Sequence, residues 1–183
     1  RVNIHVGLCD AGLAESLAAA GPDAVSIDII GSDETVREVF GLEKQAGDYW
    51  RSYEALLGAG LNVVPHITIG LRGGLDSGEL AALERLSEFM PDKLVINVLV
   101  PTKGTAFESR SVDPARALGI IKAARKNLPE ASIILGCMRP RGWVDFELAA
   151  AELGITGIVN PSREAIERWK ASGLGVDRRT ICC

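Results

Sequence analysis

Val63-Val64-Pro65-His66-Ile67-Thr68-Ile69 decides the fold, because this apolar run is interrupted at alternate positions by His66 and Thr68. Three other apolar runs show the same pattern and carry Asn3 and His5, Ser26 and Asp28, and Asn97. Strands of a parallel sheet that are buried on both faces are normally continuous apolar runs. Since side chains alternate between the two faces of a strand, we expect all seven polar residues on one face of the sheet. Burying an unpaired polar group costs about 1–3 kcal/mol, so this face is predicted to line a wet or ligand-filled cavity.

Six strand-like segments alternate with helix-like segments along the chain. The strands are expected to begin near Val2, Ala24, Asn62, Lys93, Ser132 and Ile155. Helical periodicity covers Leu13–Ala20, Glu34–Phe40, Tyr49–Leu57, Ser77–Phe89, Pro114–Asn127, Trp143–Leu153 and Arg163–Ala171, with Ser77 and Asp113 as expected N-caps. Strict alternation predicts a parallel α/β fold.

A TIM-type (β/α) barrel explains the converging polar residues better than a doubly wound sheet does. The glycine-rich stretch 70–74 lacks the spacings of the dinucleotide and P-loop motifs. In a barrel, polar residues from successive strands share one interior, and the site lies at the C-terminal ends of the strands. A full barrel takes about 250 residues, so 183 residues predict a single domain, 1–183, that forms a partial barrel of six βα units. Such a piece has two open sheet edges that another segment or another copy could cover.

Composition excludes several classes of protein. A net charge of −4, a pI near 5.3 and an aromatic fraction of 5% argue against binding to nucleic acid or an anionic membrane. The sequence has no apolar run long enough to span a bilayer. Its four cysteines lack the spacing of a disulfide framework, which predicts a reducing cytoplasm. The chain starts at Arg1 and enters a strand at once, so we expect further residues upstream.

Three segments resemble the third to sixth strands of the biotin synthase-like radical S-adenosylmethionine (SAM) enzymes. They are Ala24–Glu34, Leu61–Gly70 and, most specifically, Val95–Thr105. Arg139 falls where the seventh strand of that family ends in an arginine-containing motif. The resemblance implies that the chain is the C-terminal three-quarters of a radical SAM barrel, which abstracts hydrogen from a small substrate with the help of SAM and a [4Fe-4S] cluster.

Two departures from the family pattern qualify this expectation. The Cys-x3-Cys-x2-Cys motif that binds the cluster is absent, so its ligands are expected in a missing N-terminal segment, and this chain alone is expected to be inactive. The auxiliary cluster ligands of biotin synthase would fall at Asn3 and Val64, and neither is a thiolate. Biotin formation is therefore disfavoured, and the substrate and reaction type stay open.

The resemblance and the seven alternating polar residues described above, which we call the polar stripe, together suggest the residues of a site. The cofactor-binding set is Asp28, His66, Ile69, Gly70, Asn97, Val98 and Leu99, with Asp28 on the SAM ribose or the substrate and the backbone of 97–99 on the adenine. The substrate-binding set is Asn3, His5, Arg139 and Arg141. Cys137, Cys182 and Cys183 are further candidates for ligands of an auxiliary cluster or metal.

Structural alternatives exist for each of these residues. Asp28 could pair with Arg139 or a buried histidine, Arg139 and Arg141 could pair with Asp145 or Glu147, and Cys9 and Cys137 could be small buried residues. Two rival functions also remain. One is a cluster-free barrel enzyme, aldolase- or isomerase-like, that uses His5, Asp28 and His66 as acid–base groups or as a metal site. The other is a non-catalytic binding or assembly subunit that completes its barrel with another polypeptide.

Overall fold

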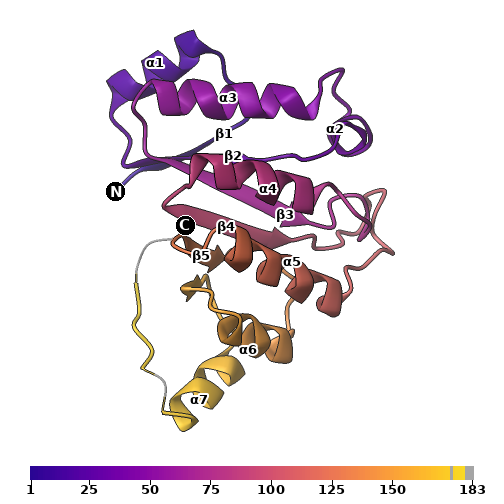
Figure 1. The fold of residues 1–183 in the computed structure, drawn as a ribbon. Helices are drawn as coiled ribbons and strands as arrows, with labels where there is room; N and C mark the ends of the chain where they lie inside the picture. The colour runs from indigo at the N-terminus through magenta and orange to yellow at the C-terminus, as the bar shows by residue number, and fades with distance from the viewer. Residues whose placement is uncertain (174, 180–183) are drawn as a thin grey trace.

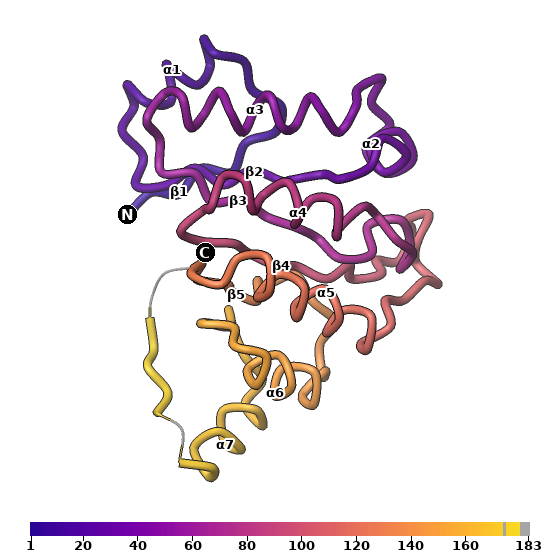
Figure 2. Tube along the Cα trace, viewed as in Figure 1, coloured from indigo at the N-terminus to yellow at the C-terminus, as the bar shows by residue number. Residues whose placement is uncertain are grey.

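Six parallel strands form one open sheet, in the order β1-β2-β3-β4-β5-β6. A computed structural model describes residues 1–173 and 175–179. The strands are β1 (Asn3–Val6), β2 (Ala24–Asp28), β3 (Val63–Ile69), β4 (Lys93–Val98), β5 (Ser132–Leu135) and β6 (Gly157–Ile158). Each strand pairs with the next one along the chain, which Figure 2 shows as an uninterrupted progression of colour across the molecule. The predicted partial (β/α) barrel is therefore confirmed.

Helices connect the strands and cover one face of the sheet (Figure 1). They are α1 (Ala11–Ala20), α2 (Asp33–Phe40), α3 (Ala46–Gly58), α4 (Glu79–Phe89), α5 (Pro114–Asn127), α6 (Val144–Glu152) and α7 (Arg163–Ala171). The main core lies between this helical layer and the strands, and it contains the fully buried Ile27, Ile67, Leu94 and Ile133. No helix of the described residues is long and apolar enough to cross a membrane.

Side chains cap several of the helix starts, whereas α4 and α6 begin without a side-chain cap. Asp113 caps α5 through its carboxylate, which accepts from the Ala115 N–H at 2.9 Å, as predicted. Ser77 was expected to cap the next helix upstream, and this prediction is wrong. The cap position of α4 is Gly78, whose φ of 86° places it against Gly31, and the Ser77 hydroxyl instead accepts from the Arg72 N–H.

Candidate functional site

The seven polar residues of the stripe share one face of the sheet. In the parallel register His5 pairs with Ser26, Asp28 with His66, and Thr68 with Asn97, and paired residues point to the same face. The residues between them, such as Ile27 and Ile67, face the helices and belong to the core. The sequence pattern therefore predicted this inner face correctly.

His5, Asp28 and His66 form a cluster on the part of the inner face that β1, β2 and β3 contribute. The Nε2 atom of His5 lies 3.3 Å from Oδ2 of Asp28, and the two side chains are 47% and 36% exposed. The rings of His5 and His66 meet edge to face, with their centroids 5.0 Å apart. His66 itself is only 6% exposed. Asp28 therefore pairs with the half-exposed His5, and not with Arg139 or a buried histidine.

The two histidines have opposite electrostatic environments. The hydrogen bond to Asp28 raises the pKa of His5, against a smaller opposing effect of burial. Burial lowers the pKa of His66 to about 4, assisted by the nearby charge of His5 and opposed by Asp28. At neutral pH His66 is uncharged, so the cluster combines a histidine with a raised pKa, a carboxylate and a neutral imidazole within one small area.

Asn97 lies over a glycine on the neighbouring strand end. A Cβ atom at Gly136 would stand 2.0 Å from Oδ1 of Asn97 and 3.0 Å from Cγ1 of Val95. The absence of a side chain at Gly136 thus makes room for the Asn97 amide on the inner face. Sequence reasoning missed this glycine, although its position directly after the β5 run was the available signal.

Asn3 is held by a second polar pair at the start of the sheet. Its Nδ2 atom lies 2.9 Å from Oγ of Ser26, and that hydroxyl is also 3.1 Å from Oδ1 of Asn3. Ser26 is fully buried, and this pair gives its hydroxyl a hydrogen-bond partner away from water. A substrate role for Asn3 stays a prediction.

The backbone of the predicted adenosine side is already engaged at several points. The Leu99 N–H donates to the Ile69 carbonyl at 2.9 Å, and the Val98 N–H donates to the Met138 carbonyl at 2.8 Å. The Gly70 N–H donates to Oε1 of Glu79 at 2.7 Å. The Ile69 side chain is fully buried in the helix-side core. The close approach that Gly70 permits is to Val112, which a Cβ atom would meet at 2.5 Å.

A buried carboxylate organises the loop after β3. Glu79 is 2% exposed and accepts from the Gly70 and Ser77 N–H groups and from the Arg116 guanidinium at 2.8 Å. It therefore fixes the glycine-rich loop 70–78 at the C-terminal ends of the strands. Sequence reasoning missed Glu79 and Arg116, because a glutamate in the first turn of a helix and an arginine on the next helix carry no mark of their pairing.

Arg139 is the centre of a second buried network, at the C-terminal end of β5. Its Nε and one terminal nitrogen donate to Oε1 of Glu147 at 2.9 and 2.6 Å. The same guanidinium donates to the carbonyls of Gly136, Val159 and Asn160. Five donors are all that a guanidinium has. The geometry leaves Arg139 no free donor for a substrate and supports the alternative of pairing with Glu147.

Arg141 and the described cysteines differ in how exposed they are. Arg141 is exposed on the loop that follows β5, where a ligand could reach it. Cys9 is buried, as expected, but Cys137 is exposed, so the expectation of a buried residue is wrong there. Cys137 comes after the last residue of β5 and enters the loop, where nothing packs over it. Cys182 and Cys183 lie outside the described residues.

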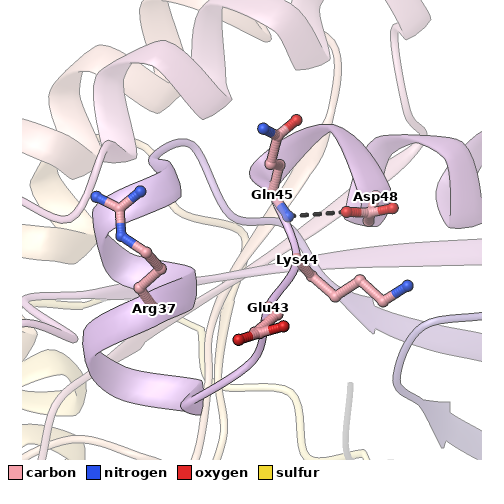
Figure 3. Close-up of a pocket in the computed structure, with 5 residues that line it drawn as sticks. All are labelled: Arg37, Glu43, Lys44, Gln45 and Asp48. Carbon is pink, nitrogen blue, oxygen red and sulfur yellow. Dashed lines mark hydrogen bonds between the residues drawn. The ribbon is translucent and has the colours of Figure 1, made fainter.

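Two structural features qualify the search for ligands. Within residues 1–173 and 175–179, no group of three or more histidine, cysteine, aspartate or glutamate side chains could hold a metal ion. A hollow of about 500 Å³ lies away from the stripe, lined by Arg37, Glu43, Lys44, Gln45 and Asp48 (Figure 3). Its walls are Gln45 and charged side chains of α2, α3 and their connection, and Asp48 caps α3 by accepting from the Gln45 N–H at 2.8 Å. We therefore place the candidate site on the inner face.

Comparison with known proteins relates part of this chain to a known domain family and its fold to solved structures. The family model described as Biotin and Thiamin Synthesis associated domain matches residues 95–167, from β4 into α7. This match confirms the relationship to biotin synthase-like radical SAM enzymes that the resemblance predicted. No curated protein matches the chain in sequence.

Solved structures share the fold at low sequence identity. The maturase HydG of the [FeFe]-hydrogenase from Carboxydothermus hydrogenoformans is 18% identical, with a TM-score of 0.71 over 95% of this chain and 47% of that one. Methylornithine synthase (PylB) is 16% identical, with a TM-score of 0.71 over 96% of this chain and 58% of that one. HMG-CoA lyase from Brucella melitensis is 13% identical, with a TM-score of 0.64 over 93% of this chain and 66% of that one. This chain thus spans about half the length of the first two relatives.

Proposed function

We propose that the chain is the SAM-binding, C-terminal three-quarters of a biotin synthase-like radical SAM barrel. The observation that carries this proposal is the inner face, where Asp28 pairs in register with His66, and Thr68 with Asn97, on three adjacent strands. The family match over residues 95–167 supports it independently. The proposal includes a small-molecule substrate, a cytoplasmic location and open edges covered by an N-terminal segment or a second copy.

The residues of the inner face suit the adenosine part of SAM. Asp28 keeps 36% of its side chain exposed, and a carboxylate can accept from two ribose hydroxyls. Asn97 offers an amide on β4, next to the last residue of that strand, Val98. Ile69 and Gly70 would support the adenosine site indirectly. The Ile69 carbonyl accepts from the Leu99 N–H, and Glu79 fixes the Gly70 backbone. Bound SAM would supply the radical precursor, and these residues would bind and orient it.

The described residues do not suit a [4Fe-4S] cluster. They contain no group of three potential ligands, and the two described cysteines, Cys9 and Cys137, are separate. We therefore propose that the cluster ligands belong to a segment before Arg1. The intact mass of the natively expressed polypeptide tests this, because the proposal requires a mass above 19.4 kDa and three closely spaced cysteines upstream.

Equilibrium binding of SAM to this chain tests the cofactor site directly. Replacing Asp28 by asparagine is expected to weaken SAM binding by tenfold or more, since hydrogen bonds to a charged acceptor contribute about 1.5–3 kcal/mol. Asp145→Asn on α6 is the matched control, because that carboxylate is 92% exposed and pairs only with Arg168. Absence of SAM binding, or equal effects of the two substitutions, would defeat the proposal.

One observation favours a second candidate, a cluster-free acid–base enzyme. His5, Asp28 and His66 combine a proton donor, a carboxylate and a neutral imidazole on one face. That function requires turnover by this chain without iron or SAM. Activity of an iron-free preparation that is lost in Asp28→Asn would select it over the radical enzyme.

A further inference from the structure

One polar atom of the inner face has no partner in the described part of the chain. Nε2 of His66 is buried and makes no hydrogen bond, although His66 is only 6% exposed. Buried polar atoms are almost always hydrogen-bonded, because an unpaired one keeps its full desolvation penalty. An unpaired buried nitrogen next to other polar groups therefore points to a ligand.

The surroundings of His66 define the chemistry of that ligand. Its register neighbours are Asp28 on β2 and Val95 on β4, and neither is a cation. Val64 lies two residues earlier on the same strand face, and Val64 and Val95 are 1% and 0% exposed. The carboxylate disfavours an anionic ligand, and the two valines form an apolar wall.

The protonation state of His66 narrows the ligand further. An imidazole with a pKa of about 4 is neutral at pH 7, so Nε2 is either a donor or an acceptor, depending on the tautomer. A hydroxyl group both donates and accepts, and it can pair with either tautomer. His5 packs against His66 and is half exposed, so its side chain can turn aside without opening the core.

We propose that Nε2 of His66 binds the hydroxyl group of a small uncharged substrate whose carbon skeleton lies against Val64 and Val95. This assignment rests on the proposed function, because it assumes that SAM binds to the neighbouring Asp28 and Asn97. His66 is then a substrate-binding residue and not a member of the cofactor-binding set predicted from the sequence.

Three probes with one carbon skeleton test the assignment: butan-1-ol, butyrate and butylamine. The methyl signals of Val64 and Val95 report binding by NMR in the full chain. The chain has only two histidines, so ¹⁵N labelling also reports Nε2 of His66 directly. Butan-1-ol is expected to shift both sets of signals saturably. It should bind about tenfold more tightly than butyrate or butylamine, because each charged probe would have to lose the hydration of its charge to pair with Nε2.

Two variants separate hydrogen bonding from apolar contact. His66→Leu removes the unpaired nitrogen, keeps the site apolar and is expected to fold, and it should weaken butan-1-ol binding about tenfold. His66→Gln keeps a donor and an acceptor and should retain more of the affinity. Equal binding of butan-1-ol to wild type and His66→Leu overturns the assignment, as does preferential binding of butyrate or the lack of any saturable shift.

A parallel titration with S-adenosylhomocysteine separates this inference from the proposed function. Binding of butan-1-ol at His66 without binding of S-adenosylhomocysteine would defeat the proposed function and leave the assignment intact. Shifts of His66 Nε2 by S-adenosylhomocysteine, with none by butan-1-ol, would return His66 to the cofactor and overturn the assignment.

Discussion

At the scale of single residues, the two histidines make stability depend on pH in opposite directions. The raised pKa of His5 contributes stability that is present below its unfolded value of 6.5 and is lost as the pH rises through the folded pKa. His66 behaves differently, because its folded pKa of about 4 lies below 6.5. Between pH 6.5 and pH 4 the unfolded chain gains a proton at His66 that the folded chain does not accept. The stability contribution of the pair therefore peaks near pH 6.5.

We predict a pH profile that depends on His66. The free energy of unfolding should fall by about 3 kcal/mol between pH 6.5 and pH 4 because of this residue alone, at about 1.4 kcal/mol per pH unit. Carboxylates also titrate in this range, so the measurement is the difference between wild type and His66→Leu in urea unfolding at several pH values. Parallel profiles for the two proteins would contradict the prediction.

The pairing of Arg139 with Glu147 is the second prediction at residue scale. Glu147→Gln should lower the free energy of unfolding by about 3 kcal/mol, because it leaves a buried guanidinium without its counter-charge. The two side chains are 5% and 6% exposed. Replacing both residues with Met and Leu should restore much of the loss.

An exposed ion pair provides the control for this measurement. Glu164 pairs with Arg168 on α7, and the two side chains are 56% and 51% exposed. Glu164→Gln is expected to change stability by less than about 1 kcal/mol. If Glu147→Gln costs no more than this, the buried network does not hold the loop after β5.

At the scale of strands and helices, replacing glycine by alanine should change stability in opposite directions at a closely packed position and at an open helical position. Gly136→Ala should destabilise the protein by about 1–3 kcal/mol, because its Cβ atom would meet the Asn97 amide. Gly119→Ala in α5 is the matched control, since a Cβ atom added at that position would meet nothing within 4 Å. Alanine there should stabilise the helix by about 0.5–1 kcal/mol. Thermal unfolding of both variants checks the prediction, and shifts of equal sign would contradict it.

The regular elements were predictable because short-range physics determines them. Alternating polar residues located the strands, and β2, β4 and β5 begin at the predicted residues. The same alternation correctly placed His5, Asp28, His66 and Asn97 on one face. Helix bounds differ from the predicted ones by a few residues where capping is decided by tertiary contacts, as at Gly78, which lies against Gly31.

Pairings between distant segments were not predictable. The hydrogen bonds of Glu79 to Gly70 and Arg116, and of Arg139 to Val159 and Asn160, join parts of the chain whose distances only the fold fixes. The sequence offered Glu147 only as one of two surface partners for Arg139. Nothing in the local sequence indicated that this carboxylate is buried.

At the scale of the whole molecule, we predict that the edge of the sheet at β1 is a site for association. β1 is the first strand of the sheet, and Val2 beside it is 59% exposed. Unpaired strand edges recruit other strands unless charge or proline protects them. We predict concentration-dependent self-association in analytical ultracentrifugation, and Val2→Lys should reduce it. Leu57→Lys, on the surface of α3, also removes an exposed apolar residue and should have no such effect. Equal behaviour of the two variants would argue against the β1 edge.

The neighbour-to-neighbour order of the strands has a consequence for how the chain folds during synthesis. Every strand pairs with the strand before it, so no strand waits for a partner made much later. Short loop closures keep the entropic barrier to pairing low. The sheet can thus grow one βα unit at a time behind the ribosome, and each new helix covers the apolar face of the strand just added. Ribosome-bound chains that end after α4 should already protect β1, β2 and β3 from proteolysis.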